Sequence, residues 1–508
     1  MYPAMKITIS ILTIVLFTFG SHSCSSRARE SALTDSTFGN YQILMKQLLE
    51  ENKIEGASVA LFDDRKVLWS AGFGFIDSDE RQSVNTQTIF SVQSMSKTFT
   101  ATAVMIAVQE GLLDLDKPIT KYLPDFTINS CFENNPEKKI TLRLMLGCTA
   151  GFTHEAPVGN NFNASFASYE EHYRSISSTW LKFPVGTQYS YSNLGFDLAA
   201  HIIDKVSGMT FSEYLDQKIF RPLSMSSTTI NAKKILGSQN RAIGSIFGMK
   251  QLPAIVPMIG AGGVYTSAEE LARFVQFHLG FGQYGEKQIL KTEHLIEMYK
   301  PIINEDYGLG IAVVNEDSTY AFNHNGGGFG FGSSMKWYPD YHIGCVILTN
   351  SEYSSVVYET VSKILHDYIK KGAARRDTDT ARFNPITYFK MIKKTHSGSM
   401  DSSTKPQCPG DSIYHSDWDK YTGTYNIDME GGFELTWYAK IAKLVGFKMP
   451  KVKVYERNKG LYLDYSEGGS YVGEQRLIEY RPGLFFTTGG EALDFRNERK
   501  TYRNIELK

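Results

Sequence analysis

The stretch Ser94-Met95-Ser96-Lys97 opens an amphipathic run over residues 98–113. On a helix, residues three apart lie on one face, so the Ser94 hydroxyl and the Lys97 amine are expected to point the same way. A serine hydroxyl is a weak nucleophile until a base within hydrogen-bond reach activates it. The unpaired N–H groups and positive dipole end of a helix start also suit a developing oxyanion. These four residues predict a nucleophilic serine at the start of a helix.

By itself the S-x-x-K pattern favours the plainer interpretation, a Ser-rich helix start with a solvated lysine. Residues 402–405 repeat it in a polar stretch without apolar periodicity, which we interpret as chance. Two further patterns follow the first in order, Tyr191-Ser192-Asn193 and His324-Asn325-Gly326. The ordered set is far more specific than any one of its members.

In this order, S-x-x-K, Y-x-N and H-x-G resemble the motifs of the serine β-lactamase and penicillin-binding-protein superfamily. The closest branch groups class C β-lactamases, serine DD-peptidases, D-aminopeptidases and related esterases. Flanking phrases extend the resemblance over residues 40–370. Residues 140–151 (ITLRLMLGCTAG) look like the family's ITIRHLLTHTSG segment, and residues 260–274 (GAGGVYTSAEELARF) look like its AAGGLYSTAEDLARF segment.

The resemblance implies a role for each motif residue. Ser94 is expected to attack a carbonyl carbon and form an acyl-enzyme. Lys97 and Tyr191 are expected to transfer the proton as a coupled pair, and which of them removes it from Ser94 stays open. Asn193 is expected to hydrogen-bond the Lys97 side chain or the substrate amide. His154 and Glu155 are interpreted as solvated residues of a rim loop.

The third motif concerns the substrate. His324 stands where β-lactamases usually carry Lys, whereas DD-peptidases, D-aminopeptidases and some esterases carry His. This favours peptide, amide or ester substrates over efficient β-lactam hydrolysis. Gly326 lets the backbone approach a ligand closely, and the N–H of Gly327 is expected to complete the oxyanion hole with that of Ser94.

The resemblance therefore implies a serine hydrolase of the DD-peptidase or D-amino-acid peptidase kind, acting on small-molecule or peptide substrates such as peptidoglycan peptides. The alternatives are an esterase of the same family, and a penicillin-sensing or peptidoglycan-binding protein with slow or no turnover. We expect no cofactor and no metal, since the chain contains no C-x-x-C or H-E-x-x-H pattern.

The N-terminus predicts export. Lys6 precedes an apolar run over residues 7–20, followed by small residues, so residues 1–24 are interpreted as a signal peptide. The run is too short for a confident membrane span. Cys24 resembles the lipidation site of bacterial lipoproteins, which predicts a lipid anchor in the periplasm or cell envelope. The alternative is a plain cleaved signal with an incidental cysteine.

Charge and cysteine content narrow the setting further. Lys and Arg number 53 against 54 Asp and Glu, with no basic stripe, which argues against a nucleic-acid partner. An exported chain can form disulfides. Cys131, Cys148, Cys345 and Cys408 allow three pairings, which stay open. Cys345 lies in an apolar, strand-like run and is expected to be a buried thiol.

The 508 residues suggest two or more domains. Strand patterns occur early, at residues 57–70, and late, at 308–314 and 333–349, with helical patterns between them. The predicted fold class is α+β, a β-lactamase/transpeptidase-like antiparallel sheet flanked by helices plus an all-helical lobe. Alternating residues near the C-terminus predict a small, lipocalin-like all-β barrel. The expected order is a tether (25–37), a catalytic domain (38–372), a linker (373–416) and the barrel (417–508).

Overall fold

The computed structural model describes residues 22–77, 79, 82–160, 168–246, 250, 252–303, 306–316, 319–352, 354–372, 418–426, 451–457, 460–467, 470–487, 491–496, 500–502 and 505–507. Most of the predicted signal peptide and the predicted linker lie outside these residues. The chain divides into two units, Met1–Met45 and Lys46–Lys508. Helix α1 (His22–Asn52) spans this boundary and includes both Cys24 and the residues predicted as a tether. In the part of the chain that is described, no helix is long and apolar enough to cross a membrane.

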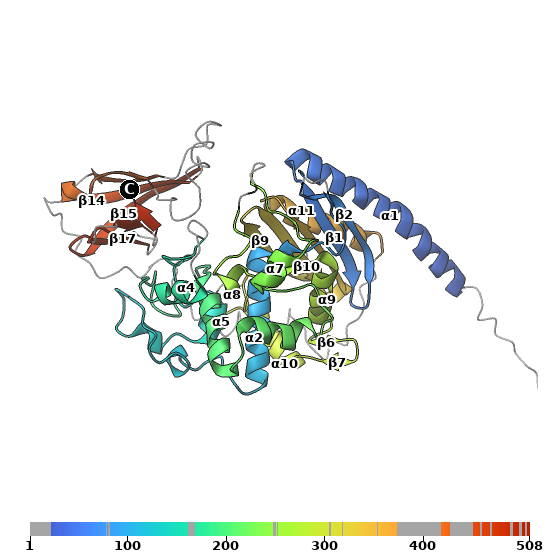
Figure 1. The fold of residues 1–508 in the computed structure, drawn as a ribbon, viewed down its shortest axis with the longest axis horizontal. Coiled ribbons are helices and arrows are strands. Elements are labelled where there is room, and N and C mark those ends of the chain that lie inside the picture. The colour runs from blue at the N-terminus through green and yellow to red at the C-terminus, as the bar shows by residue number, and fades with distance from the viewer. Residues whose placement is uncertain are drawn as a thin grey trace, which may run out of the picture. The chain divides into compact units, whose positions relative to one another are not determined.

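A seven-stranded antiparallel sheet forms the frame of the second unit (Figure 1). Its strand order, β3-β2-β1-β11-β10-β9-β8, pairs the early strand β1 with the late strand β11, from Ala57 opposite Thr349 to Asp63 opposite Ile343. The early and late strand patterns therefore lie in one antiparallel sheet, as the predicted fold class requires. The strands are β1 (Gly56–Asp63), β2 (Val67–Asp77), β3 (Gln82–Ser83), β8 (Ala312–Glu316), β9 (Thr319–Gly328), β10 (Phe331–Tyr338) and β11 (Ile343–Thr349).

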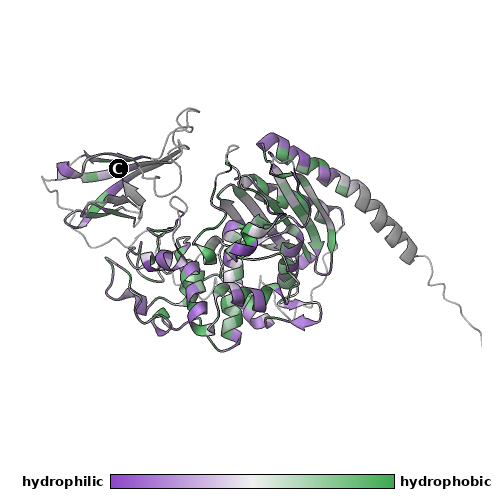
Figure 2. Ribbon diagram, viewed as in Figure 1, coloured by the Kyte–Doolittle hydropathy of each residue, from purple (hydrophilic) through white to green (hydrophobic). Residues whose placement is uncertain are grey.

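Helices cover both faces of this sheet. On β10, the Lys336 ammonium donates to Ser362 of α11 (Ser354–Lys370) at 3.0 Å. The ring of the next residue, Trp337, lies 5.3 Å from the ring of His278 on α9 (Ala268–Leu279). Successive side chains of a strand point to opposite faces, so α11 and α9 lie on opposite faces. In Figure 2 the strands of the sheet are largely hydrophobic, as burial on both faces requires.

The helical lobe lies between β3 and β8 in the sequence, and α2 (Ser96–Gln109) runs through its middle. We predicted an amphipathic run to residue 113, but α2 ends at Gln109 and is buried on nearly every side. Its polar residues are tolerated because their hydroxyls are satisfied. Thr98 donates to the Gly310 carbonyl at 2.8 Å and Thr100 to the Gly260 carbonyl at 2.6 Å.

Further helices and two small sheets complete this region. The helices are α3 (Leu142–Leu146), α4 (Tyr169–Ile176), α5 (Leu194–Ser207), α6 (Phe211–Leu215), α7 (Ala232–Gly237), α8 (Ile259–Gly262) and α10 (Thr292–Met298). Two small sheets pair β4 (Phe90–Ser91) with β5 (Tyr265–Thr266), and β6 (Gln283–Tyr284) with β7 (Lys287–Gln288).

The C-terminal strands form an eight-stranded antiparallel sheet in which each strand pairs with the next along the chain. On β13, Val452 and Val454 are buried while Lys451 and Lys453 are exposed, so alternation builds one apolar face. In the described residues β12 and β19 remain its two edges, so the predicted barrel is a half-barrel. The strands are β12 (Gly423–Asn426), β13 (Lys451–Arg457), β14 (Gly460–Glu467), β15 (Ser470–Arg481), β16 (Leu484–Thr487), β17 (Ala492–Asp494), β18 (Lys500–Tyr502) and β19 (Ile505–Leu507).

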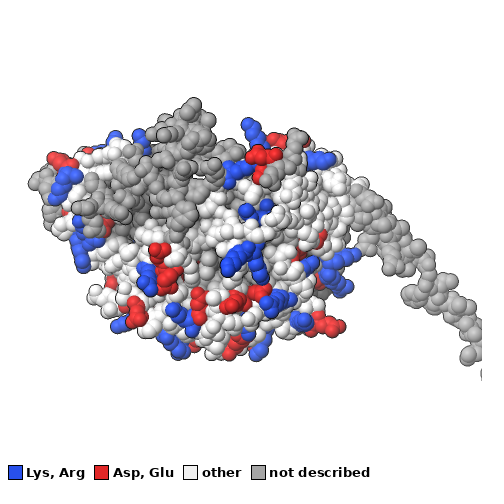
Figure 3. Space-filling model, viewed as in Figure 1, with Lys and Arg blue, Asp and Glu red and all other residues white. Residues whose placement is uncertain are grey.

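On the face shown in Figure 3, basic and acidic side chains are interspersed. Cys148 and Cys345 are free and buried, which confirms the prediction for Cys345. Cys131 is disulfide-bonded.

We expect Phe99→Ala to lower the free energy of unfolding by about 3–5 kcal/mol, because the Phe99 ring on α2 stacks on Phe274 of α9 at 3.8 Å and both are fully buried. Urea denaturation followed by tryptophan fluorescence measures the change. Leu112→Ala, at an exposed apolar site, is the control and should cost less than about 1 kcal/mol. Equal losses in the two variants would contradict this assignment of the core.

Candidate active site

Ser94 lies in a tight turn that projects it from a buried segment. The turn is a single 3-10 turn, η1 (Gln93–Met95), directly before α2. Gln93 has a φ of 48°, a left-handed conformation that non-glycine residues rarely adopt and that concentrates at functional sites. Val92 and Met95 are fully buried, whereas Ser94 is only half-buried. The strained turn thus leaves the hydroxyl accessible.

The Lys97 amine is within hydrogen-bond reach of this hydroxyl. Its Nζ lies 3.1 Å from Ser94 Oγ and donates at 3.1 Å to the carbonyl of Ala261 on α8. The side chain has no exposed surface. Burial lowers the pKa of Lys97 to about 8, against the opposing influence of Asp197 and other groups. A lysine that gives up its proton near neutral pH can act as a general base toward a bound hydroxyl.

Asp197 and His172 hold the Ala261 carbonyl in place, and sequence reasoning did not find either residue. Asp197 Oδ1 accepts from the N–H groups of Gly260 and Ala261, each at 3.0 Å. Its Oδ2 lies 3.0 Å from His172 Nε2, and both side chains are fully buried. His172 Nδ1 donates to the Val158 carbonyl at 2.7 Å. Burial opposes a charge on His172, but the bond to Asp197 prevails and raises its pKa.

Tyr191 completes the group around Ser94. Lys97 Nζ lies 4.9 Å from the centre of the Tyr191 ring. Burial raises the pKa of Tyr191 well above its ordinary value, although a hydrogen bond with Ser94 favours the ionised form. The phenol is therefore protonated at neutral pH. Of the two candidate bases, Lys97 has the pKa closer to neutrality.

Asn193 contacts a residue that the sequence analysis misjudged. Its amide Nδ2 donates to Glu155 Oε1 at 2.9 Å, so the described contact is neither to Lys97 nor to a ligand. Glu155, which we expected to be solvated, is only 4% exposed and also lies 3.0 Å from His154 Nδ1. That expectation was wrong because the loop carrying Glu155 folds inward against the Y-x-N segment, where Asn193 N donates to the His154 carbonyl.

His324 is buried on β9 with both ring nitrogens engaged. Nδ1 lies 2.8 Å from the Asn325 carbonyl, which only accepts, so Nδ1 carries the hydrogen. Burial and the nearby Lys97 charge lower the pKa of His324 to about 3, so the ring is neutral. Nε2 then accepts from the Tyr307 hydroxyl at 3.2 Å. Tyr307, a residue without a recognised motif, also hydrogen-bonds the buried Cys148 thiol.

Strand β9 approaches Ser94 through its glycines. A Cβ on Gly326 would lie 2.1 Å from the Val92 carbonyl oxygen, so only glycine fits at this contact. Gly327 is exposed and follows directly. β8 pairs with β9 only as far as Asn323, so in the described structure the backbone edge of β9 beyond Asn323 has β10 as its one partner strand. This open edge beside Ser94 could receive an extended substrate.

The structure thus brings together Ser94, Lys97, Tyr191 and His324. Gly326 lies against Val92, with Gly327 next to it, whereas the Asn193 side chain is bonded to Glu155. Within the described ranges, no group of three or more His, Cys, Asp or Glu side chains is arranged to hold a metal ion. A serine, a buried lysine and a tyrosine in mutual contact, on this sheet and helical lobe, define a serine hydrolase.

Comparison with known proteins identifies the family. The Beta-lactamase family model matches residues 42–366, so the chain belongs to the beta-lactamase family. Protein flp of Staphylococcus aureus strain MW2 is 26% identical over 372 residues, covering 66% of this chain and 70% of flp. Penicillin-binding protein 4* of Bacillus subtilis strain 168 is 23% identical over 359 residues, covering 64% of this chain and 75% of that protein.

Solved structures share the fold. The octameric penicillin-binding protein homologue from Pyrococcus abyssi matches with a TM-score of 0.58 and 20% identity, over 92% of this chain and 95% of that one. A class C beta lactamase from Rhodobacter sphaeroides matches with a TM-score of 0.54 and 21% identity, over 65% of this chain and 99% of that one. These likenesses confirm the predicted fold class.

We expect the rate of acylation at Ser94 to rise with pH and to level off above an apparent pKa of about 8, because Lys97 must be neutral to take the proton. Below that value the neutral fraction falls tenfold per pH unit, so the rate at pH 6 should be about 50-fold lower than at pH 8. Labelling by a fluorophosphonate between pH 5.5 and 10 measures this. A flat profile from pH 6 to 8 would contradict the role of Lys97, and circular dichroism at each pH controls for unfolding.

Proposed function

We propose that this protein is an exported hydrolase that forms an acyl-enzyme on Ser94. The 3.1 Å contact between Ser94 and the buried Lys97 amine carries the proposal. Neutral Lys97 takes the hydroxyl proton as Oγ attacks the carbonyl carbon. The N–H groups of Ser94 and Gly327 bind the oxyanion. Collapse of the tetrahedral intermediate breaks the bond to the leaving group, which receives the proton from Lys97 by way of Tyr191. Water then hydrolyses the acyl ester.

We propose peptides that contain D-amino acids, including peptidoglycan peptides, as substrates. Two comparisons bear on this: one relative is named a penicillin-binding protein, and the matching family model is that of the β-lactamases. The open edge of β9 suits an extended peptide, since backbone groups can pair with it as a further strand. His324 stands in place of the Lys that β-lactamases usually carry, which favours peptide bonds over β-lactams.

An esterase is the second candidate, favoured by the state of His324. A neutral, fully bonded imidazole supplies no positive charge to a substrate carboxylate. Without a cation at this position, the site has no charge that selects a peptide with a free C-terminal carboxylate over an uncharged ester. A penicillin-sensing protein would use the same residues and differ in slow hydrolysis of the acyl ester.

For the chain as a whole, we propose a catalytic domain (38–372), a linker (373–416) and a C-terminal half-barrel domain (417–508). We further propose a lipid anchor at Cys24 that holds the protein in the periplasm or at the cell envelope. The disulfide at Cys131 supports export, because disulfides persist in oxidising compartments.

We expect residues 25–508 to react covalently with a fluorophosphonate and with a fluorescent penicillin, and Ser94→Ala to react with neither, because the variant lacks the nucleophile. Intact mass over time measures formation and loss of the adduct. Turnover of D-amino-acid anilides and of p-nitrophenyl esters then separates peptidase from esterase. A stable penicillin adduct without turnover of either substrate would indicate a sensing protein. Labelling that persists in Ser94→Ala would refute the mechanism.

The lipid anchor is tested separately in cells. In a bacterial host fed radiolabelled palmitate, the wild-type chain should incorporate the label and sediment with membranes, and Cys24→Ala should do neither, because the thiol is the site of acylation. Cys345→Ala, at a buried free thiol, is the control and should behave as wild type. Equal palmitate incorporation in wild type and Cys24→Ala would exclude Cys24 as the anchor.

A further inference from the structure

One lysine links the C-terminal sheet to the segment that carries Tyr191. Lys182 Nζ lies 2.7 Å from Glu491 Oε1, at the start of β17, and donates to Ser190 Oγ at 3.1 Å. The Lys182 and Glu491 side chains are 16% and 9% exposed. Ser190 directly precedes Tyr191. A carboxylate of the half-barrel is therefore linked by two contacts to Ser190, the residue next to Tyr191.

The segment between Lys182 and Tyr191 is anchored along its length. Lys182 N donates to the Gly151 carbonyl at 2.8 Å, and Ser190 N donates to the Cys148 carbonyl at 2.9 Å. Val185 N donates to Glu133 Oε1 at 2.8 Å. These bonds fix the backbone of the segment at three points, and the Ser190 hydroxyl adds a side-chain contact next to Tyr191.

An apolar cluster docks the half-barrel independently of this ion pair. The Trp180 ring makes edge contacts with Tyr480 at 6.0 Å and with Phe486 at 5.4 Å. Leu484 and Ala492 pack in the same cluster. Removing the charge of Glu491 should therefore leave the half-barrel docked. A slower reaction would then report a change in the position of Tyr191 and not the loss of the half-barrel contact.

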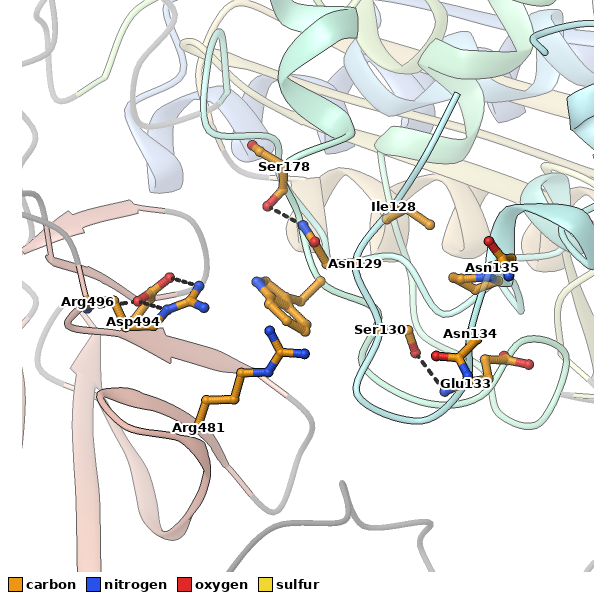
Figure 4. Close-up of a pocket in the computed structure, with 12 residues that line it drawn as sticks. Ile128, Asn129, Ser130, Glu133, Asn134, Asn135, Ser178, Arg481, Asp494 and Arg496 are labelled. Atoms are coloured by element: carbon orange, nitrogen blue, oxygen red, sulfur yellow. Dashed lines mark hydrogen bonds and ion pairs between the residues drawn. The ribbon is translucent and has the colours of Figure 1, made fainter. Parts of the chain in front are cut away.

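A hollow of about 440 Å³ lies beside the cluster. Figure 4 shows Arg481, Asp494 and Arg496 of the half-barrel on one side of it, and residues 128–130 and 133–135 on the other. A polar hollow of this size can hold water, so packing there is incomplete. Among the described residues, Trp180 and Lys182 make the ring and ion-pair contacts with the half-barrel.

We propose that Glu491 is a positioning residue for the reaction at Ser94, an inference that rests on the acyl transfer proposed above. Its carboxylate holds the Lys182 ammonium, the ammonium holds Ser190, and Ser190 fixes Tyr191 against Ser94. An ammonium buried without its partner is costly. When Glu491 loses its charge, Lys182 turns toward water, Ser190 is released, and Tyr191 loses its alignment with the hydroxyl.

The test compares two matched variants by their kinetics of fluorophosphonate labelling. Glu491→Gln should lower the maximal rate constant of labelling about tenfold and leave the half-saturating probe concentration unchanged, because Tyr191 acts in the chemical step. Glu316→Gln breaks another largely buried pair, with Lys336 at 2.8 Å, and should label at the wild-type rate. Thermal melting checks that both variants are folded.

A charge exchange shows whether the pair itself matters. Glu491→Lys and Lys182→Glu should each slow labelling at least tenfold. The double variant restores an ion pair and a group that can bond Ser190, so it should recover to within about threefold of wild type. Wild-type rates in a folded Glu491→Gln, or no recovery in the double variant, would overturn the proposal. Absence of labelling in the wild-type chain would overturn the acyl transfer first, and this inference with it.

Discussion

The amine of Lys97 has no exposed surface, and the site is organised around that burial. An ammonium taken out of water loses its hydration, so its proton is held less tightly and the neutral amine becomes available near pH 8. The amine keeps two partners, Ser94 and the Ala261 carbonyl, that can bond it in either state. Helix α2, which carries this lysine, can be buried because the hydroxyls of its Thr98 and Thr100 donate to carbonyl groups.

Support for this arrangement comes from both parts of the catalytic region. The helical lobe supplies Asp197, which binds the N–H groups of α8 and so aims the Ala261 carbonyl at Lys97. The sheet supplies β9, whose Gly326 fits against the Val92 carbonyl just before the strained Gln93. The nucleophile thus lies where a buried helix meets a sheet, and its surroundings are fixed before a substrate arrives.

Much of this could be predicted from the sequence, because three short motifs keep their order and their flanking phrases. They indicated Ser94, Lys97 and Tyr191, while the strand patterns at residues 57–70, 308–314 and 333–349 indicated the strands of the sheet. Asp197, Glu155 and Tyr307 could not be predicted in this way. Each is a single polar residue without a spacing of its own, and only the tertiary fold buries it beside the site. The Lys182–Glu491 pair joins two distant segments, so no local pattern signals it.

The central claim is that burial lowers the pKa of Lys97 to about 8, so that the neutral amine forms in the pH range where Ser94 reacts, and direct titration of this lysine tests it. In protein labelled with [13Cε]lysine, the signal that is missing from a Lys97→Arg variant belongs to Lys97. The account predicts that this signal titrates near pH 8, while the signals of exposed lysines titrate at about pH 10.4. A Lys97 signal that titrates with the exposed lysines would mean that almost no neutral amine is present at pH 8, and would contradict its role as the base for Ser94.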